Sequence, residues 1–269
     1  MKYLSAILVL LVALVRADTL DFARQTIVVT ALQQESGPIA VGDDYPGRAL
    51  SVLRAATFDR DLMVGSFLAA HAKSAARLER MTLESQRGET KYLSDGSVST
   101  DYLFPITATM REQLQPDREE IKLLGRRACP CCGQPWPEGR DVPAGLTLVP
   151  YEDANAPVYS GILVDARGLS LKPALFPRLV TEDDDQAYGP DFADPKELPR
   201  AGLVAYYASR TEALASERVG GDPLVIRAIA RAGSNDCDAV ISGYDASRLH
   251  GTKADLALLA KCKVGFLLD

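Results

Sequence analysis

The sequence is poor in histidine and in long apolar runs. Its 269 residues include two His, one Trp and five Cys. Two histidines are too few for a His-rich metal site or a histidine relay. Beyond residue 15, no stretch approaches the ~18 uninterrupted apolar residues of a membrane-spanning helix. We also find no G-x-S-x-G, P-loop or H-E-x-x-H motif, so we expect a protein that is not an enzyme.

The composition is that of a folded protein with an acidic surface. Hydrophobic residues make up 47% and charged residues 25%, and Asp+Glu exceed Lys+Arg by 36 to 30. A net charge of −6 argues against a nucleic-acid partner, because such proteins usually carry a basic face. A chain of this length usually makes one or two domains, and a domain of either size is large enough to bury a hydrophobic core.

The first seventeen residues have the pattern of a secretory signal peptide. Lys2 precedes an apolar run from Leu4 to Val15, broken only by Ser5, and Arg16-Ala17 offers a small residue at the exit. No Cys lies near this point, so the lipid-attachment box of a bacterial lipoprotein is missing. We therefore expect residues 1–17 to direct the chain to the periplasm. An N-terminal core helix or an uncleaved anchor is the alternative.

Residues 18–115 predict an N-terminal α+β unit. The β-branched run from Thr26 to Leu32 favours a strand, and the apolar spacing from Arg48 to His71 favours one long helix. Asp95-Gly96 stands between two β-prone runs, which is a strong hairpin signal. Residues 116–150 then form a linker that holds an insert rich in Cys and Pro.

Residues 151–269 predict a second α+β domain. Extended runs are expected at 161–165, 174–180 and 224–232. Asp238 to Ser242 follows as a short buried strand. Asp245 stands where the N-cap of a helix reaching Ala260 would lie, and residues 263–268 close as a strand. The fold class is therefore α+β: two small mixed units with antiparallel hairpins and a closing strand-helix-strand crossover.

The insert Cys129-Pro130-Cys131-Cys132-Gly133 contains a C-x-x-C pair, Cys129 and Cys132, in the form of a zinc knuckle. A tetrahedral site needs two more ligands. The remaining candidates, Cys237, Cys262, His71 and His250, form no second C-x-x-C.

An oxidising compartment favours disulfides instead. Cys237 and Cys262 precede two C-terminal strands, so a bridge between them is expected. Within the insert, a Cys129–Cys132 bond and a vicinal Cys131–Cys132 bond both stay open. A redox-active pair would normally open a helix, whereas Pro135-Trp136-Pro137 follows this insert.

Two charged clusters have competing interpretations. Asp165-Ala166-Arg167-Gly168 ends an apolar strand, either as a pocket edge where Arg167 binds an anion or as an Asp–Arg pair that fixes a turn. Asp183-Asp184-Asp185 supplies the oxygens that calcium prefers, but it lacks the alternating order of a calcium loop and is also typical of a solvated turn.

Two C-terminal segments carry a resemblance to a known family. These are Tyr159 to Leu169 with Lys172-Pro173-Ala174-Leu175, and Asp238 to Ser242 with Tyr244-Asp245-Ala246. With scattered matches over residues 48–269, the chain resembles exported bacterial proteins of the twenty-kilodalton envelope lipoprotein superfamily and its FlgP/FlgT-type flagellar relatives. It departs from them in lacking a lipobox Cys and in having Asp184-Asp185 where relatives favour Asp-Gly.

The resemblance implies a non-catalytic periplasmic protein in cell-envelope or flagellum-associated assembly. Its partners would be envelope or flagellar proteins and further copies of the chain, and no cofactor is implied. Asp165, Arg167, Gly168 and Asp245 would then serve the fold or an interaction edge. The alternative function is a zinc-binding or disulfide-linked module built on Cys129 and Cys132.

Overall fold

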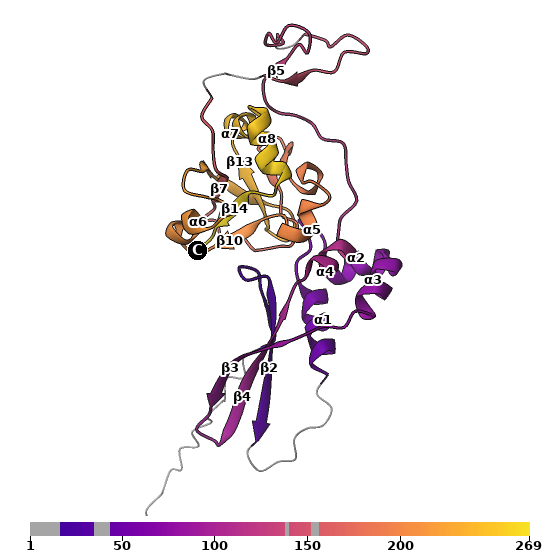
Figure 1. Cartoon of the computed structure of the whole chain (residues 1–269), viewed down its shortest axis with the longest axis vertical. Helices are drawn as coiled ribbons and strands as arrows, with labels where there is room; N and C mark the ends of the chain where they lie inside the picture. Colours follow the sequence, from indigo (N-terminus) through magenta and orange to yellow (C-terminus); the bar gives the residue numbers. More distant parts are fainter. Residues whose placement is uncertain (1–16, 35–43, 138–139, 152–155) are drawn as a thin grey trace, which may run out of the picture.

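A computed structural model describes residues 17–34, 44–137, 140–151 and 156–269. The predicted signal peptide lies outside these residues, except for Ala17. Figure 1 shows a globular body, a narrow sheet that extends from one end, and a small ribbon beyond the other end. Helices and strands are mixed throughout, in antiparallel and parallel sheets, which confirms the α+β class.

The N-terminal sheet is antiparallel and has the order β1-β2-β4-β3. Its strands are β1 (Thr19–Asp21), β2 (Thr26–Gln34), β3 (Gln86–Tyr92) and β4 (Ser97–Pro105). Alternation in β2 turns Ile27, Val29 and Ala31 inward. The predicted hairpin is confirmed: Gly96 adopts φ +79°, and the Asp95 carboxylate accepts the Ser97 N–H. We call the part of this sheet formed by β2, β3 and β4, which extends away from the body in Figure 1, the arm.

The single helix predicted over residues 48–71 is wrong, because the chain breaks between residues 56 and 63. The helices of this unit are α1 (Tyr45–Ala55), α2 (Val64–Ala70), α3 (Ala72–Glu79) and α4 (Ala108–Gln113). At the break, the Asp59 carboxylate accepts the N–H groups of Asp61 and Leu62, which closes a tight turn. The turn carries Phe58 into the body, so tertiary packing overrides the helical spacing.

The body contains two four-stranded sheets. The first has the order β10-β14-β7-β11 and is parallel throughout; the second, β12-β13-β8-β9, is mixed. The strands of the first are β7 (Ile162–Asp165), β10 (Ala205–Tyr207), β11 (Leu224–Arg227) and β14 (Val264–Leu267). Those of the second are β8 (Leu179–Thr181), β9 (Gln186–Tyr188), β12 (Ala230–Ala232) and β13 (Asp238–Ile241).

The closing strand-helix-strand order is present, but its two strands lie in different sheets, so the predicted crossover within one sheet is wrong. The intervening helix is also two helices, α7 (Gly243–Leu249) and α8 (Lys253–Ala260). Ser242 caps the first and Thr252 the second, each accepting an N–H from the third residue along. Asp245 is therefore not the N-cap but that third residue, and its own carboxylate accepts the Ser242 hydroxyl.

Two other extended runs are shorter than predicted. In the run at 174–180 only Leu179 and Val180 belong to a strand, and the run at 224–232 divides into β11 and β12 of different sheets. The remaining short helices of the body are η1 (Pro190–Phe192), α5 (Glu197–Ala201) and α6 (Arg210–Ala215).

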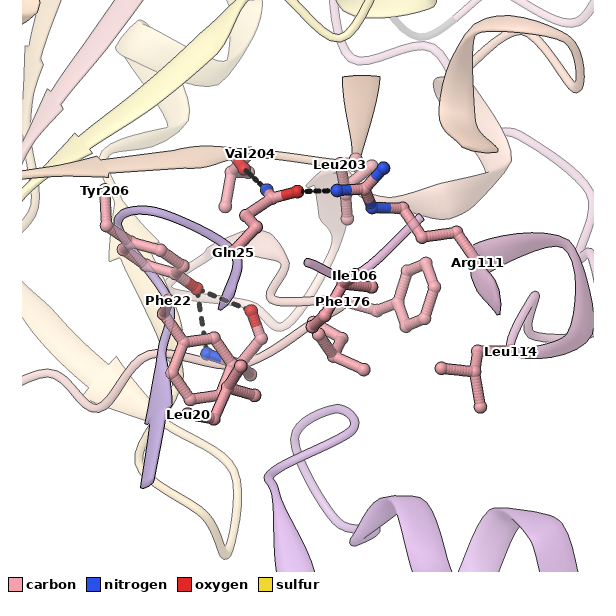
Figure 2. Close-up of a pocket in the computed structure, with 13 residues that line it drawn as sticks. Leu20, Phe22, Gln25, Ile106, Arg111, Leu114, Phe176, Leu203, Val204 and Tyr206 are labelled. Atoms are coloured by element: carbon pink, nitrogen blue, oxygen red, sulfur yellow. Dashed lines mark hydrogen bonds between the residues drawn. The ribbon is translucent and has the colours of Figure 1, made fainter. Parts of the chain in front are cut away.

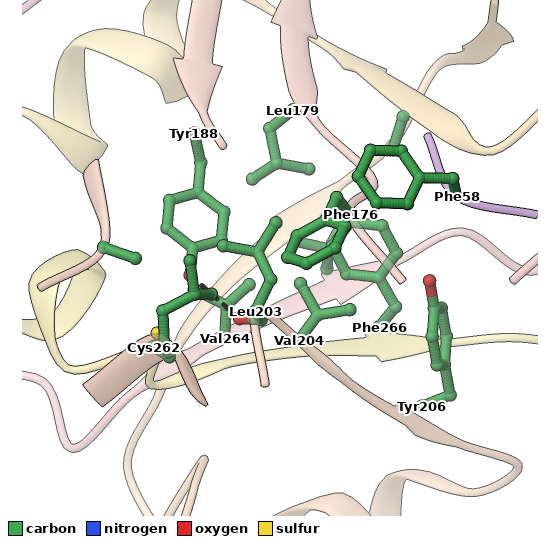
Figure 3. Close-up of a cluster of buried hydrophobic side chains, with 14 of the residues drawn as sticks. Phe58, Phe176, Leu179, Tyr188, Leu203, Val204, Tyr206, Cys262, Val264 and Phe266 are labelled. Atoms are coloured by element: carbon green, nitrogen blue, oxygen red, sulfur yellow. Dashed lines mark hydrogen bonds between the residues drawn. The ribbon is translucent and has the colours of Figure 1, made fainter. Parts of the chain in front are cut away.

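One hydrophobic core runs from the N-terminal unit into the body. Phe58 stacks on Phe67 at 4.2 Å between ring centroids and meets Phe176 of the body at 4.9 Å. Figure 3 shows Phe58 beside Phe176 and the aromatic and aliphatic side chains of both body sheets. The backbone N–H of Phe176 also bonds to the Phe58 carbonyl at 2.8 Å. The two predicted units are therefore packed against each other around one continuous hydrophobic core.

Candidate functional site

The cysteine insert forms a small ribbon, residues 126–151, which stands apart from the body (Figure 1). Its paired strands are β5 (Arg127–Ala128) and β6 (Val149–Pro150), and Tyr151 N–H extends the pairing to the Arg126 carbonyl. Of the residues between 127 and 149 whose side chains are described, Ala128 alone is buried. The ribbon therefore has almost no core of its own.

Within the ribbon, the C-x-x-C segment folds as a tight knuckle. Cys129 N–H bonds to the Gln134 carbonyl at 3.0 Å, and Gly133 N–H bonds to the Cys129 carbonyl at 2.8 Å. Gly133 adopts φ +71°, a conformation that a side chain would strain. The Cys129 sulfur accepts the backbone N–H groups of Cys131 and Cys132 and also interacts with the thiols of both residues. These contacts lower the pKa of Cys129 below its ordinary value.

In the knuckle, the Cys131 and Cys132 thiols both lie beside the Cys129 sulfur. Cys129 is half-buried, whereas Cys131 and Cys132 are exposed, and all three are free thiols. Within the described ranges, no three His, Cys, Asp or Glu side chains are placed to hold one metal ion. Hence Cys129 and Cys132 together make half of a four-ligand zinc site.

The disulfide predicted between Cys237 and Cys262 is absent, since both are free, buried thiols. Cys237 precedes β13 of the mixed sheet, with its sulfur 3.8 Å from an Asp238 carboxylate oxygen. Cys262 precedes β14 of the parallel sheet and lies beside Tyr188, as Figure 3 shows. The prediction placed both strands in one sheet, and the division into two sheets gives each thiol separate neighbours. Burial raises the pKa of both thiols, that of Cys262 to about 11.

Neither histidine is available to the knuckle. His250, a candidate ligand from the sequence, is buried at 1% exposure. Its Nδ1 accepts the Leu124 N–H at 2.8 Å and its Nε2 lies 2.7 Å from the Ala187 carbonyl. The ring thus fastens the linker to the body, and burial lowers the pKa of His250. His71 joins α2 to α3 and stacks on Phe67.

The Asp165–Arg167 pair closes a turn at the end of β7. Arg167 Nε and Nη2 donate to the Asp165 carboxylate at 2.9 and 2.7 Å, and this pairing lowers the pKa of Asp165. Gly168, at φ +81°, donates its N–H to the Asp269 carboxylate at 2.9 Å. Asp245 pairs with Arg248 at 3.2 Å on α7. In this arrangement Arg167 is held by its neighbour rather than directed into a pocket.

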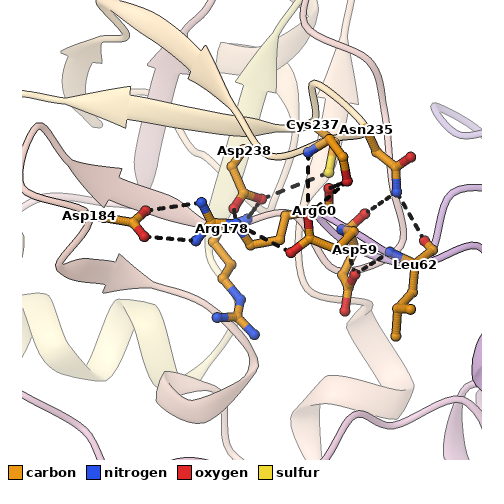
Figure 4. Close-up of polar contacts among 10 residues, drawn as sticks. Asp59, Arg60, Leu62, Arg178, Asp184, Asn235, Cys237 and Asp238 are labelled. Atoms are coloured by element: carbon orange, nitrogen blue, oxygen red, sulfur yellow. Dashed lines mark hydrogen bonds and ion pairs between the residues drawn. The ribbon is translucent and has the colours of Figure 1, made fainter.

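A polar cluster where the 57–63 turn meets the body was not predicted from the sequence (Figure 4). Arg60 Nη2 bonds to Asp184 at 3.0 Å, and its Nε lies 3.4 Å from Asp238. Asn235 Nδ2 donates to the carbonyls of Asp59 and Leu62. Arg60 and Asn235 are surface-type residues far apart in the chain, so only the docking of the turn brings them together.

Asp238 is the unusual member of this polar cluster. Its side chain is fully buried and accepts the Arg178 N–H at 2.8 Å through Oδ1. Asp238 Oδ2 makes no hydrogen bond with any described residue, and neither does Arg178 Nε. Burial raises the pKa of Asp238 to about 6. The acidic run also has structural partners, because Asp184 pairs with Arg60 and Asp185 with Lys122.

An apolar pocket also lies between the N-terminal unit and the body (Figure 2). Its free space is about 20 Å³, which holds no more than about one water molecule. At its polar edge, Arg111 Nη2 donates to Gln25 Oε1, Gln25 Nε2 donates to the Val204 carbonyl, and Arg111 Nη1 donates to the Pro199 carbonyl. Burial lowers the pKa of Arg111 to about 10. This pocket is a narrow gap in the interface between the N-terminal unit and the body, and it is too small for a substrate.

Comparison with known proteins finds a similarity in the body. Residues 161–269 match the protein-family model of the second domain of Treponema pallidum Tp0624. The match begins one residue before β7 and contains both body sheets, but not the ribbon or the arm. No curated protein matches the chain. Among the described residues, no helix has the length and apolar character needed to cross a membrane.

Proposed function

We propose that this protein is an exported, non-catalytic component of the bacterial cell envelope that serves in assembly. The observation that carries the proposal is its architecture: one body that resembles a Tp0624 domain and bears two projections, the arm and the ribbon. An elongated protein of this kind presents separate contact surfaces at both ends. The apolar run at residues 4–15 supports export to the periplasm.

The arm has the character of a contact surface. Along β3 most side chains are exposed, and Tyr92 at its end is 84% exposed. Among the described strands, β3 pairs only with β4, so it is an edge strand that offers its outer backbone groups to another chain. The flagellar part of the proposal rests on the scattered resemblance of residues 48–269 alone.

Export is tested by fractionation. Leu10→Arg, which interrupts the apolar run, should leave an unprocessed precursor in the cytoplasm, whereas Leu10→Ile should be processed and reach the periplasm like the unmodified chain. Cytoplasmic location of the unmodified protein would refute the proposal.

Assembly is tested in a deletion strain. Loss of the gene should weaken the envelope, measured as increased sensitivity to detergent, and impaired swimming would assign the flagellar role. A photo-crosslinking residue in place of Tyr92 should give discrete adducts with envelope proteins. The control is the same residue in place of Tyr244, which is 74% exposed on the body. A normal envelope and normal swimming, together with equal adducts from both positions, would refute an assembly role.

A further inference from the structure

The ribbon lacks the interactions that normally hold a segment of its size in one conformation. Its strands are two residues each, and its free cysteines form no disulfide. Trp136 is only partly buried and contacts Arg140, whose guanidinium lies 5.9 Å from the ring centroid. Segments this short usually need a disulfide, a metal ion or a partner chain to persist. The ribbon therefore requires something beyond its own described side chains.

The knuckle has the geometry of a metal ligand pair. A tight backbone turn joins the two cysteines of the C-x-x-C segment, closed by the Gly133 N–H on the Cys129 carbonyl, and Gly133 has positive φ. Two backbone N–H groups face the Cys129 sulfur. Such N–H groups stabilise the negative charge of a bound thiolate. The Cys131 thiol also contacts Cys129, but the three cysteines are not placed to hold one metal ion.

Among the described residues, the other candidate zinc ligands are engaged elsewhere. Cys237 and Cys262 are buried in the body, and both ring nitrogens of His250 are engaged by the backbone. The ribbon stands apart from the body and exposes Cys132, so two copies can approach each other by their ribbons. In a twofold-symmetric contact, a pair of ligands from one copy meets the same pair from the other.

We propose that Cys129 and Cys132 of two copies of this chain bind one zinc ion, so that the ribbon joins the protein into a dimer through a four-thiolate site. Each of the four thiols releases its proton to solvent as zinc binds. The resulting site carries a charge of −2, and each ribbon has a net charge of +1, from Arg126, Arg127 and Arg140 against Glu138 and Asp141. The site requires neither export nor an assembly role, so it is tested independently of the proposed function.

The experiment uses the processed chain, purified without chelator and with thiols kept reduced. Zinc content by elemental analysis should be about one ion per two chains, and light scattering should give a dimer that becomes monomeric when zinc is removed. Replacing zinc with cobalt should produce the intense visible absorption of tetrahedral cobalt thiolate. The core contains no residue of the ribbon, so circular dichroism of the folded protein should stay unchanged throughout.

Three variants separate the knuckle ligands from a nearby thiol. Cys129→Ser and Cys132→Ser should each reduce bound zinc to background and yield monomers. Cys131→Ser is the matched control, and it should retain both zinc and the dimer because Cys131 is outside the ligand pair. Circular dichroism identical to that of the unmodified chain establishes that the loss is local to the ribbon.

Several outcomes would overturn the proposal. Zinc bound at one ion per chain in a monomer would mean that the other ligands lie within the same chain. Absence of zinc, with thiol titration and mass measurement showing a Cys129–Cys132 or Cys131–Cys132 bond, would assign the knuckle a disulfide instead. Loss of zinc from Cys131→Ser equal to that from Cys129→Ser would place a third thiol in the site. A dimer that persists after zinc is removed would show that dimerisation does not depend on the metal.

Discussion

At the scale of single residues, Asp238 is a fully buried acid whose Oδ2 makes no hydrogen bond with any described residue. Its carboxylate is fully buried between Arg60 and Arg178, with Asp59 and the Cys237 thiol also close. The nearest guanidinium nitrogen of Arg60 lies 3.4 Å from Oδ2, too poorly aligned to make a hydrogen bond. The cost of burial exceeds the attraction of the two arginines, so the pKa of Asp238 rises rather than falls.

Stability should therefore depend on the protonation of Asp238. Because its folded pKa of about 6 exceeds the ordinary value of 3.8, the folded protein binds this proton more tightly than the unfolded chain does. The stabilisation is complete below pH ~4 and is lost as pH rises through ~6, and the shift of about two pKa units corresponds to about 3 kcal/mol. Asp238→Asn should be more stable than the unmodified protein at pH 7 by up to this amount, measured by urea unfolding.

The comparison across pH distinguishes titration from a packing effect. The advantage of Asp238→Asn should shrink towards zero at pH 4, where the native carboxyl is protonated. Asp61→Asn is the control: the Ser234 hydroxyl lowers the pKa of Asp61, so this variant should lose stability relative to the unmodified protein near neutral pH. A difference between Asp238→Asn and the unmodified protein that is constant from pH 4 to pH 7 would contradict the assignment.

At the scale of elements, the sequence predicted short local structures well and long ones poorly. The hairpin at Asp95-Gly96 and strand β2 follow from local conformational preference, and both are confirmed. The helices predicted over 48–71 and 246–260 each break. Apolar spacing continued across both breaks, but Asp59 closes a turn in one and Thr252 starts a new helix in the other. Such side-chain-to-backbone bonds interrupt a helix without disturbing its hydrophobic period.

The cap at Thr252 gives a direct test of this break. Thr252 Oγ1 accepts the Asp255 N–H at 3.1 Å and donates to its carboxylate at 2.7 Å, and both groups are partly buried. Thr252→Ala removes both bonds and should destabilise the protein by about 1 kcal/mol, measured by thermal and urea unfolding. Thr252→Ser keeps the hydroxyl and should cost much less. Equal losses for Ala and Ser would mean that the methyl group, not the cap, stabilises α8.

The candidate site residues also differ in how far the sequence predicted them, according to whether they are neighbours in the chain. The zinc-type knuckle was visible in the sequence because Cys129, Cys132 and Gly133 are neighbours in the chain. The cluster of Arg60, Asp184 and Asp238 was not visible, since its members come together only when the 57–63 turn docks on the body. The expected Cys237–Cys262 bridge failed because it depended on assigning two strands to one sheet. Interactions that require tertiary placement left no local pattern to recognise.

At the scale of the whole molecule, the continuous core should make the N-terminal unit and the body unfold together. Phe58 is 1% exposed and contacts an aromatic ring on each side of the junction. Phe58→Ala should cost about 3–5 kcal/mol through lost burial and the cavity left behind. Calorimetry of the unmodified protein should show one transition, and Phe58→Ala should lower its midpoint or divide it into two.

Tyr92→Ala is the control for this loss of aromatic surface. Because Tyr92 is largely exposed on the arm, its removal should change stability by no more than about 0.5 kcal/mol. Two separate transitions in the unmodified protein would instead show that the shared core does not couple the units.

The topology of the parallel sheet also sets the order in which the chain becomes able to fold. Strand β14 lies between β10 and β7, with Val264 paired to Ile162 and Gly265 to Ala205. No shorter product that stops before residue 264 can complete this sheet, and its central position would be left open. Contacts so distant in sequence form late. A chain still emerging from a ribosome therefore cannot complete its parallel sheet, and the final step of folding waits for residues 264–267.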